Sequence, residues 1–420
     1  MKNRGIQMII SGNKNLDFTI EAPASKSIYH RELIVRFLSG DTGNLTDQEG
    51  DNEDILATRG CLRALADAGN TNSDTAVLPC NESGSTIRFM IPVAAACLLR
   101  EGHETNVKEL VFTTKGRLFD RPVKELADAL SPMGITITKN ETDRSIHVTG
   151  CLKAGDFTID GSVSSQYISG LLMALPLFDT PCTIHVTGEC KSVHYIELTL
   201  DVLSKYGCNA DFKDSTYYPK TNGYCSEEGN ETLNAPFKVE GDWSNGAFLL
   251  CLKEWSNITV TNLNPDSRQG DRAITEYLKL VQDKNAHPEV TWDCTDTPDI
   301  APYMAIVAPF SFGKTTFTGI GRLRIKESDR VRAVREQLSA VGIKTEETEN
   351  SLTVYEYESP RGDELPKPLK LSSYHDHRMA MCAILLAVIL KTEVEIDDVE
   401  CLKKSFPEFL NYYLPEYFTE

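Results

Sequence analysis

The chain has 420 residues, of which 41% are hydrophobic and 25% are charged, so it has room for two or three globular domains and is neither disordered nor collagen-like. Its 43 Lys and Arg face 61 Asp and Glu, and a net charge of −18 disfavours binding to nucleic acids or anionic membranes, which need a basic surface. No apolar run reaches the roughly 18 residues that span a membrane, and residues 1–17 resemble neither a secretory signal nor a transit peptide, so we expect a cytoplasmic protein.

Along the chain, short β-rich runs end in small polar residues, and a strongly apolar helix follows each run. Ser, Thr and Asp at such points are typical of helix N-caps, because their side-chain oxygens accept hydrogen bonds from free backbone N–H groups. Predicted helices such as 167–178 and 379–390 are apolar on nearly every face, which indicates that they are buried. The predicted starts are Ser25-Lys26-Ser27, Ser83-Gly84-Ser85, Ser162-Val163-Ser164-Ser165, Asp242-Trp243-Ser244, Thr297-Pro298-Asp299 and Asp376-His377-Arg378.

An amphipathic helix is predicted after each apolar helix. Three of them end with Gly134, Gly207 or Gly342, where a helix C-terminus favours a left-handed residue, and alternating strands such as 135–138 come next. The predicted amphipathic helices span residues 55–66, 122–133, 195–206, 272–281, 329–340 and 406–414. The pattern predicts six α/β units, three in each domain, with a candidate boundary at 217–236; the alternative is an ordinary α/β chain whose rhythm is accidental.

The cysteines and histidines give no metal-binding pattern. Twelve cysteines are scattered without any C-x-x-C spacing, which is typical of reduced core residues in a cytosolic protein. His375 and His377 alternate, but no further Cys or His stands close to them in sequence, so we expect no metal site.

Basic and hydroxyl side chains gather at the predicted helix starts. A helix N-terminus offers free N–H donors and partial positive charge, and therefore suits anions. Each Lys or Arg alone is best interpreted as a solvated surface residue, but together they predict a cationic site for more than one phosphate or carboxylate. The residues concerned are Lys26, Ser27, Arg31, Arg88, Arg117, Ser164, Ser165, Gln166, Arg378 and the basic run at 322–330.

Seven sequence motifs occur in one order over nearly the whole chain. They are ASKSIYHR from residue 24, ESGSTIR from 82, GSVSSQ from 161, PD from 298, KESDR from 326, DHRMAM from 376 and KSFP from 404. In these motifs the chain resembles the 5-enolpyruvylshikimate-3-phosphate (EPSP) synthase, or 3-phosphoshikimate 1-carboxyvinyltransferase, family of enolpyruvyl transferases.

The resemblance implies an α/β fold, a two-domain inverse α/β barrel built from six β-α-β-α-β-β units. It implies that residues 1–21 with 237–420 form one domain and 22–236 the other, with the active site in the cleft between them, in a monomer. The implied reaction transfers the enolpyruvyl group of phosphoenolpyruvate to the 5-hydroxyl of shikimate 3-phosphate and releases phosphate, through a tetrahedral intermediate. It belongs to the shikimate pathway of chorismate and aromatic amino-acid biosynthesis and needs no metal or organic cofactor.

The resemblance also implies residue roles. Asp299 takes the proton from the 5-hydroxyl, Glu327 is the acid–base group at the methyl carbon, and Lys26 serves both substrates. Shikimate 3-phosphate is expected at Lys26, Ser27, Arg31, Ser164, Ser165, Gln166, Ser192, Asp299 and Lys326. Phosphoenolpyruvate is expected at Lys26, Gly84, Arg117, Gln166, Arg330, Arg378 and Lys404. On the residues alone, Asp299 equally suits a helix N-cap, and Glu327 a salt bridge to Lys326 or Arg330.

The chain departs from one branch of the family at two places. Glu82-Ser83-Gly84-Ser85 replaces Asn-Ala-Gly-Thr, and Arg322 stands where that branch has Asn, so the contact of that Asn is not transferred.

Three alternatives remain. UDP-N-acetylglucosamine enolpyruvyl transferase carries a catalytic-loop Cys, which residues 115–122 lack, and RNA 3′-phosphate cyclases fit the acidic composition poorly. A non-catalytic anion-binding protein on this fold would be expected to lose Asp299, Glu327 or the arginines, and all are present.

Overall fold

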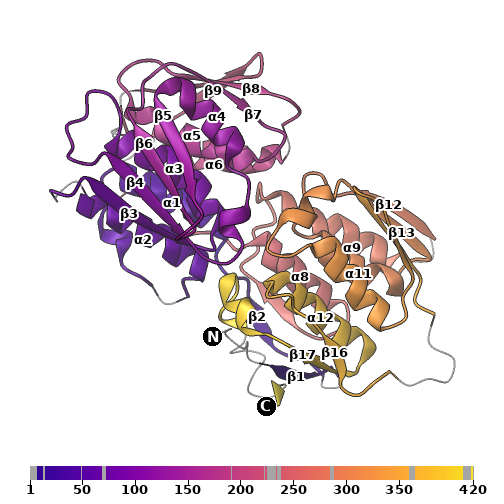
Figure 1. Cartoon of the computed structure of the whole chain (residues 1–420). Helices are drawn as coiled ribbons and strands as arrows, with labels where there is room; N and C mark the ends of the chain where they lie inside the picture. Colours follow the sequence, from indigo (N-terminus) through magenta and orange to yellow (C-terminus); the bar gives the residue numbers. More distant parts are fainter. Residues whose placement is uncertain are drawn as a thin grey trace. The chain divides into compact units, whose positions relative to one another are not determined.

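The computed structural model of the chain describes residues 7–12, 15–48, 50–68, 72–190, 192–221, 223–224, 233, 238–283, 288–358, 365–409 and 418–419. The chain divides into two compact α/β units (Figure 1). Met1–Ala24 and Glu240–Glu420 form the first unit, and Ser25–Val239 form the second unit. None of the helices in the described ranges combines the length and hydropathy needed to span a membrane.

The second unit contains two four-stranded sheets with strand orders β3-β4-β6-β5 and β7-β8-β10-β9. Their strands are β3 (Thr75–Asn81), β4 (Glu109–Thr114), β5 (Ile135–Asn140), β6 (Ser145–Gly150), β7 (Asp156–Asp160), β8 (Thr183–Thr187), β9 (Ala210–Lys213) and β10 (Thr216–Pro219). Its α-helices are α1 (Lys26–Leu38), α2 (Glu53–Ala68), α3 (Gly84–Leu98), α4 (Lys124–Leu130), α5 (Ser165–Ala174) and α6 (Val193–Lys205). Short 3₁₀ helices are η1 (Gly43–Leu45), η2 (Leu118–Asp120), η3 (Ser131–Met133) and η4 (Leu175–Leu177).

The first unit contains two four-stranded sheets, β12-β13-β15-β14 and β16-β17-β1-β18, and the parallel pair β11-β2. Its strands are β1 (Met8–Ser11), β2 (Thr19–Glu21), β11 (Thr259–Thr261), β12 (Glu289–Asp293), β13 (Lys314–Thr318), β14 (Thr345–Glu347), β15 (Ser351–Tyr355), β16 (Leu369–Leu371), β17 (Glu393–Ile396) and β18 (Phe418–Thr419). Its α-helices are α8 (Trp243–Lys253), α9 (Ile274–Gln282), α10 (Ala301–Val307), α11 (Arg330–Ala340) and α12 (His377–Leu390). Its 3₁₀ helices are η5 (Gly270–Ala273), η6 (Ala308–Phe310), η7 (Gly321–Ile325) and η8 (Glu400–Lys404).

All four of these sheets repeat one pairing pattern. Each has a parallel pair at one side, and the next two strands pair antiparallel to their neighbours. The helix between the parallel strands is α3, α5, α10 or α12, because parallel strands need a crossover connection. These crossover helices are apolar on nearly all faces and lie in the core; residues 377–388 of α12 are all buried.

Five of the six predicted helix starts carry the expected N-cap. They are Ser25 for α1, Ser83 for α3, Ser164 for α5, Asp242 for α8 and Asp376 for α12, and in the last four the side chain accepts a backbone N–H. The left-handed residues predicted after three amphipathic helices are also confirmed, since Gly134, Gly207 and Gly342 have φ of +90°, +70° and +81°.

One predicted helix start differs from the structure, and one predicted helix is not tested. Helix α10 has Ile300 as its N-cap instead of a residue of the Thr297-Pro298-Asp299 start, and the Asp299 carboxylate accepts a hydrogen bond from Arg330. The helix predicted at 406–414 lies largely outside the described residues.

Candidate active site

Arg330, the first residue of α11, is the centre of an ion-pair network in the first unit. Its side chain is 2% exposed. Nε and Nη2 donate to the two carboxylate oxygens of Asp376 over 2.8 and 3.1 Å, and Nη1 donates to Oδ1 of Asp299 over 2.9 Å. Nη2 also donates to Oε2 of Glu327 over 2.8 Å. One planar guanidinium therefore fixes three carboxylates, a task that its forked donors suit.

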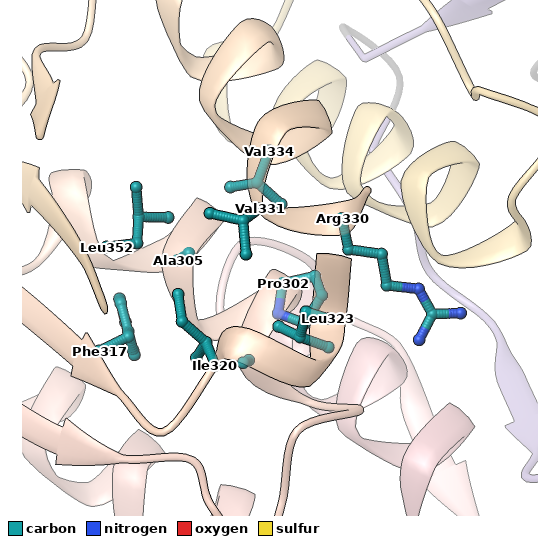
Figure 2. A pocket seen from close by; sticks show the side chains of 10 residues that line it. Pro302, Ala305, Phe317, Ile320, Leu323, Arg330, Val331, Val334 and Leu352 are labelled. Atoms are coloured by element: carbon teal, nitrogen blue, oxygen red, sulfur yellow. The ribbon is translucent and has the colours of Figure 1, made fainter. Parts of the chain in front are cut away.

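The aliphatic part of Arg330 lies at the edge of a small apolar pocket in the same unit. Besides Arg330, the residues that line the pocket are Ala301, Pro302, Ala305, Phe317, Ile320, Leu323, Val331, Val334 and Leu352. Figure 2 shows the guanidinium of Arg330 pointing away from these apolar side chains. Packing of the stem against the core thus restricts the directions in which the charged group can point.

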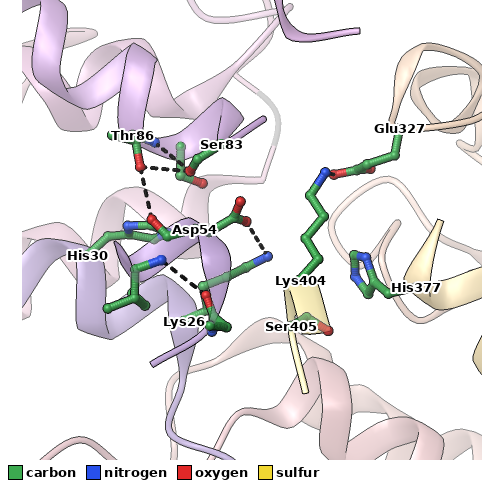
Figure 3. Close-up of polar contacts among 12 residues, drawn as sticks. Lys26, His30, Asp54, Ser83, Thr86, Glu327, His377, Lys404 and Ser405 are labelled. Carbon is green, nitrogen blue, oxygen red and sulfur yellow. Dashed lines mark hydrogen bonds and ion pairs between the residues drawn. The ribbon is translucent and has the colours of Figure 1, made fainter. Parts of the chain in front are cut away.

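Three further predicted cations join the network through its carboxylates. Lys326 Nζ lies 3.4 Å and Arg378 Nε lies 3.7 Å from Asp299 Oδ1. Lys404 Nζ lies 3.6 Å from Glu327 Oε1 (Figure 3). The structure therefore brings together, within one unit, both predicted catalytic carboxylates and four of the predicted cations.

Opposing effects act on the ionisation of Asp299. Burial alone raises the pKa of this carboxyl, but the charges of Lys326, Arg378 and Arg330 outweigh burial and hold the pKa well below its usual range. Asp299 is consequently ionised at neutral pH and can accept a hydrogen bond from a substrate hydroxyl. An ionised Asp299 also explains why the cations can lie so close together.

Asp376 is a residue of the network that the sequence analysis placed only at a helix start. Its carboxylate caps α12 by accepting the backbone N–H of Arg378, and it also accepts the Ser328 hydroxyl over 3.0 Å. It is fully buried and holds Arg330 with both oxygens. The sequence indicated only one part of this role, the N-cap that was predicted two residues before Arg378.

We expect Asp376→Ala to lower the free energy of unfolding by about 3–5 kcal/mol, because it leaves a buried arginine with one carboxylate fewer and removes a helix cap. Urea denaturation of the variant and wild type measures the difference. Asp266→Ala, at an exposed position of the same unit, is the matched control and should change stability by less than about 0.5 kcal/mol. A loss below about 1 kcal/mol for Asp376→Ala would contradict this account.

In the second unit, Arg31 of α1 is a buried cation that is 2% exposed. Nε donates to Thr199 Oγ1 over 2.6 Å, Nη2 donates to Tyr195 O over 2.9 Å, and Nη1 donates to Ser27 O. Nη2 also contacts the Ser169 hydroxyl over 3.3 Å. Burial lowers the pKa of Arg31 to about 10, so the residue remains charged at neutral pH. The hydrogen bonds join the starts of α1 and α6 and fix the backbone of Ser27.

Lys26, at the start of α1, is held by Asp54 of α2. Its Nζ lies 2.8 Å from Asp54 Oδ2, and the Asp54 carboxylate is nearly buried (Figure 3). The backbone oxygen of Asp54 faces the Thr86 hydroxyl, which donates to Ser83, the N-cap of α3. The position of Lys26 is therefore tied to the start of a second helix.

The polar residues predicted at the start of α5 also meet those of α3. Gln166 Nε2 donates to the Ser85 hydroxyl over 2.8 Å, and Gln166 Oε1 accepts from Arg88 Nη1 over 2.8 Å. Ser164 caps α5 and Ser165 is its first residue, and both are buried. Ser192, also buried, precedes α6 with a left-handed φ of +55°.

Gly84 marks a close approach that the sequence analysis did not foresee. A Cβ at this position would lie 2.3 Å from Nη1 of Arg121, so the guanidinium lies directly against the glycine. Arg117, the arginine predicted for this part of the site, is exposed. Both arginines flank η2 and are four residues apart. Their spacing in the sequence does not indicate which of them lies against Gly84.

We expect Gly84→Ala to displace the Arg121 guanidinium while leaving stability nearly unchanged, because the clashing atom is the flexible end of a side chain. If Arg121 binds an anionic substrate, KM for that substrate should rise by about tenfold, the loss of one charge-assisted hydrogen bond. Steady-state kinetics and thermal unfolding test this. Gly43→Ala, whose Cβ would meet only Asp41 at 3.5 Å, is the control; equal KM values in both variants would contradict the expectation.

Comparisons with known proteins agree over almost the entire chain. The 3-phosphoshikimate 1-carboxyvinyltransferase of Clostridium kluyveri is 34% identical over 421 residues, covering 94% of this chain and 93% of the relative. That of Clostridioides difficile is 30% identical and covers 93% of both.

The structural comparisons show the fold. EPSP synthase from Acinetobacter baumannii superposes with a TM-score of 0.70 at 19% identity over 99% of this chain and 100% of the other. The enolpyruvyl transferase NikO from Streptomyces tendae superposes with a TM-score of 0.64 at 15% identity over 98% of this chain and 97% of the other.

The family model of EPSP synthase (3-phosphoshikimate 1-carboxyvinyltransferase) matches residues 10–412. The chain therefore belongs to the EPSP synthase family.

Proposed function

We propose that this enzyme transfers the enolpyruvyl group of phosphoenolpyruvate to the 5-hydroxyl of shikimate 3-phosphate and releases phosphate. The observation that carries the proposal is the network around Arg330, where Lys326, Arg378 and Lys404 also surround two carboxylates. The reaction needs both elements: cations for a phosphate and a carboxylate, and acid–base groups for an oxygen and a carbon.

The proposed donor-binding residues come from both units. Arg330, Arg378 and Lys404 supply cations from the first unit, and the second unit contributes Lys26, Gly84, Arg117 and Gln166. We add Arg121 to this set because its guanidinium lies against Gly84. The bidentate donors of an arginine suit a phosphate or a carboxylate better than a single ammonium does.

The proposed acceptor-binding residues lie mainly in the second unit. They are Lys26, Ser27, Arg31, Ser164, Ser165, Gln166 and Ser192, with Asp299 and Lys326 from the first unit. The helix starts at Ser27 and Ser164 offer backbone N–H groups and hydroxyls to a phosphate. Because the guanidinium of Arg31 is already engaged by four protein groups, we propose that part of its role is to fix Ser27.

The proposed mechanism divides the proton transfers between the two carboxylates. Asp299, ionised beside three cations, accepts the hydrogen of the 5-hydroxyl as that oxygen attacks carbon 2 of the donor. Glu327 delivers a proton to carbon 3 and recovers one when the tetrahedral intermediate loses phosphate. The proton held by Asp299 then passes to the leaving phosphate, so both carboxyl groups return to their starting states. The cations beside both groups stabilise the charge that moves onto that phosphate.

The finer features of the fold belong to the same proposal. The repeated sheet pattern supports an inverse barrel of six β-α-β-α-β-β units, three in each domain, with domains at 1–21 plus 237–420 and at 22–236. We propose a cytoplasmic monomer. Free thiols support a reducing compartment: all the cysteines described here are unlinked, and Cys61 and Cys80 keep their sulfurs 3.8 Å apart.

A phosphate-release assay tests the function. Purified enzyme is incubated with phosphoenolpyruvate and either shikimate 3-phosphate or UDP-N-acetylglucosamine. We expect phosphate release with shikimate 3-phosphate alone. Release only with the nucleotide sugar would assign the rival transferase activity, and no release with either acceptor would favour an anion-binding protein without catalysis.

A further inference from the structure

Asp271 is a buried carboxyl of the first unit that no role described so far uses. It lies in η5, and its side chain is 3% exposed. Oδ2 accepts a hydrogen bond from the Ser244 hydroxyl at the start of α8. Oδ1 is buried and has no hydrogen-bond partner among the described residues. A buried carboxylate with an unsatisfied oxygen is costly when charged, so this environment favours the protonated acid.

The charges that act on Asp271 come from three residues outside η5. Asp299 precedes α10, Asp242 caps α8, and Arg378 is the second residue of α12. On α9, the helix that follows η5, Glu276 and Lys279 are exposed. Burial, together with the charges of Asp299 and Asp242, outweighs Ser244 and Arg378 and raises the pKa of Asp271 to about 7. The carboxyl therefore sits where one proton decides its charge near neutral pH.

We propose that Asp271 is a positioning residue that carries a proton while phosphoenolpyruvate is bound, and so leaves the charge of Arg378 available to the donor. The inference rests on the proposed function, in which Arg378 binds the donor. An ionised Asp271 would add a further negative charge to the surroundings of Arg378, where Asp299 already lies 3.7 Å from Nε. The protonated acid removes that competition without removing Ser244 or the surrounding packing.

Donor binding is expected to weaken as the pH rises. Below about pH 7, Asp271 is mostly protonated, and the donor meets an Arg378 whose charge Asp271 does not offset. As the pH rises further, the carboxyl ionises and repels the donor anion. Since the two effects are linked, donor binding favours proton uptake, and proton loss weakens donor binding by the same factor.

The test measures kcat/KM for phosphoenolpyruvate from pH 6 to 9 at saturating shikimate 3-phosphate. The kcat/KM of the wild type should fall about tenfold from pH 6 to 9, the factor that corresponds to one pKa unit of coupling. Asn is a neutral isostere of Asp. In Asp271→Asn, kcat/KM should therefore fall by less than about twofold beyond the fall that titration of the donor itself causes. Asp266→Asn makes the same change at an exposed position five residues away and should behave like wild type.

A second variant keeps the test decisive should Asp271→Asn fail to fold. The Ser244 hydroxyl stabilises the ionised form, so Ser244→Ala should move the alkaline fall in kcat/KM to higher pH. An unchanged fall in Asp271→Asn, or no shift in Ser244→Ala, overturns the role of Asp271. Absence of phosphate release from wild type at every pH would instead overturn the proposed function.

Discussion

Replacement of Glu327 by Gln is expected to lower turnover by at least about 10²-fold, the low end for a general acid–base group, and to abolish exchange of the methyl hydrogens with solvent. Gln keeps the size of the side chain and can still face Arg330 and Lys404, but it cannot deliver a proton to carbon. Binding of shikimate 3-phosphate should stay nearly intact. Turnover is measured by phosphate release, hydrogen exchange by mass spectrometry in D₂O, and binding by calorimetric titration.

The competing interpretation of Glu327 is that it only forms salt bridges. Its contacts with Arg330 at 2.8 Å and Lys404 at 3.6 Å show that these ion pairs exist, so geometry alone does not separate the two roles. Glu346→Gln removes an exposed ion pair with Lys344 from the same unit and serves as the control. Near-normal turnover in Glu327→Gln would reduce this residue to a salt-bridge partner.

Replacement of Asp299 by Asn is expected to lower turnover by a similar factor and, unlike the change at Glu327, to weaken shikimate 3-phosphate binding. A hydrogen bond to a charged group contributes about 1.5–3 kcal/mol, so the dissociation constant should rise at least about tenfold. Donor binding should not weaken, because removing a carboxylate leaves Lys326, Arg378 and Arg330 more positive.

Calorimetric titration with shikimate 3-phosphate and the KM for phosphoenolpyruvate separate these effects. Asp293→Asn changes an exposed carboxylate six residues upstream and is the matched control. Weaker binding of both substrates together would indicate general disruption of the site and would contradict a specific role of Asp299 toward the acceptor hydroxyl.

The local features of the fold could be predicted from the sequence because they depend on neighbouring residues. N-caps such as Ser83 and Ser164 and the left-handed Gly134 act within a few residues of their own helix. Asp299 shows where this reasoning fails. It has the chemistry of an N-cap, but its carboxylate binds Arg330, which is distant in sequence, and α10 begins after Ile300.

The candidate site could be predicted as a set of residue types, but not as a set of contacts. Arg31 was expected to face substrate, and the structure shows its donors engaged by Thr199, Ser27 and Tyr195. The approach of Arg121 to Gly84 was not predicted, because only the folded chain brings this guanidinium against the glycine. Such contacts join segments far apart along the chain, where no periodicity or spacing records them.

The pairing of β1 with β17 has a consequence for the order in which the chain folds during synthesis. Met8 lies opposite Ile396, so strand β1 lacks its partner strand β17 until nearly the whole chain has left the ribosome. The second unit, Ser25–Val239, is continuous and can fold while Glu240–Glu420 are still being made, which takes about 10–40 s at ordinary rates. During that interval the apolar strand at the N-terminus has no sheet to join, and it is the segment on which chaperones are expected to act.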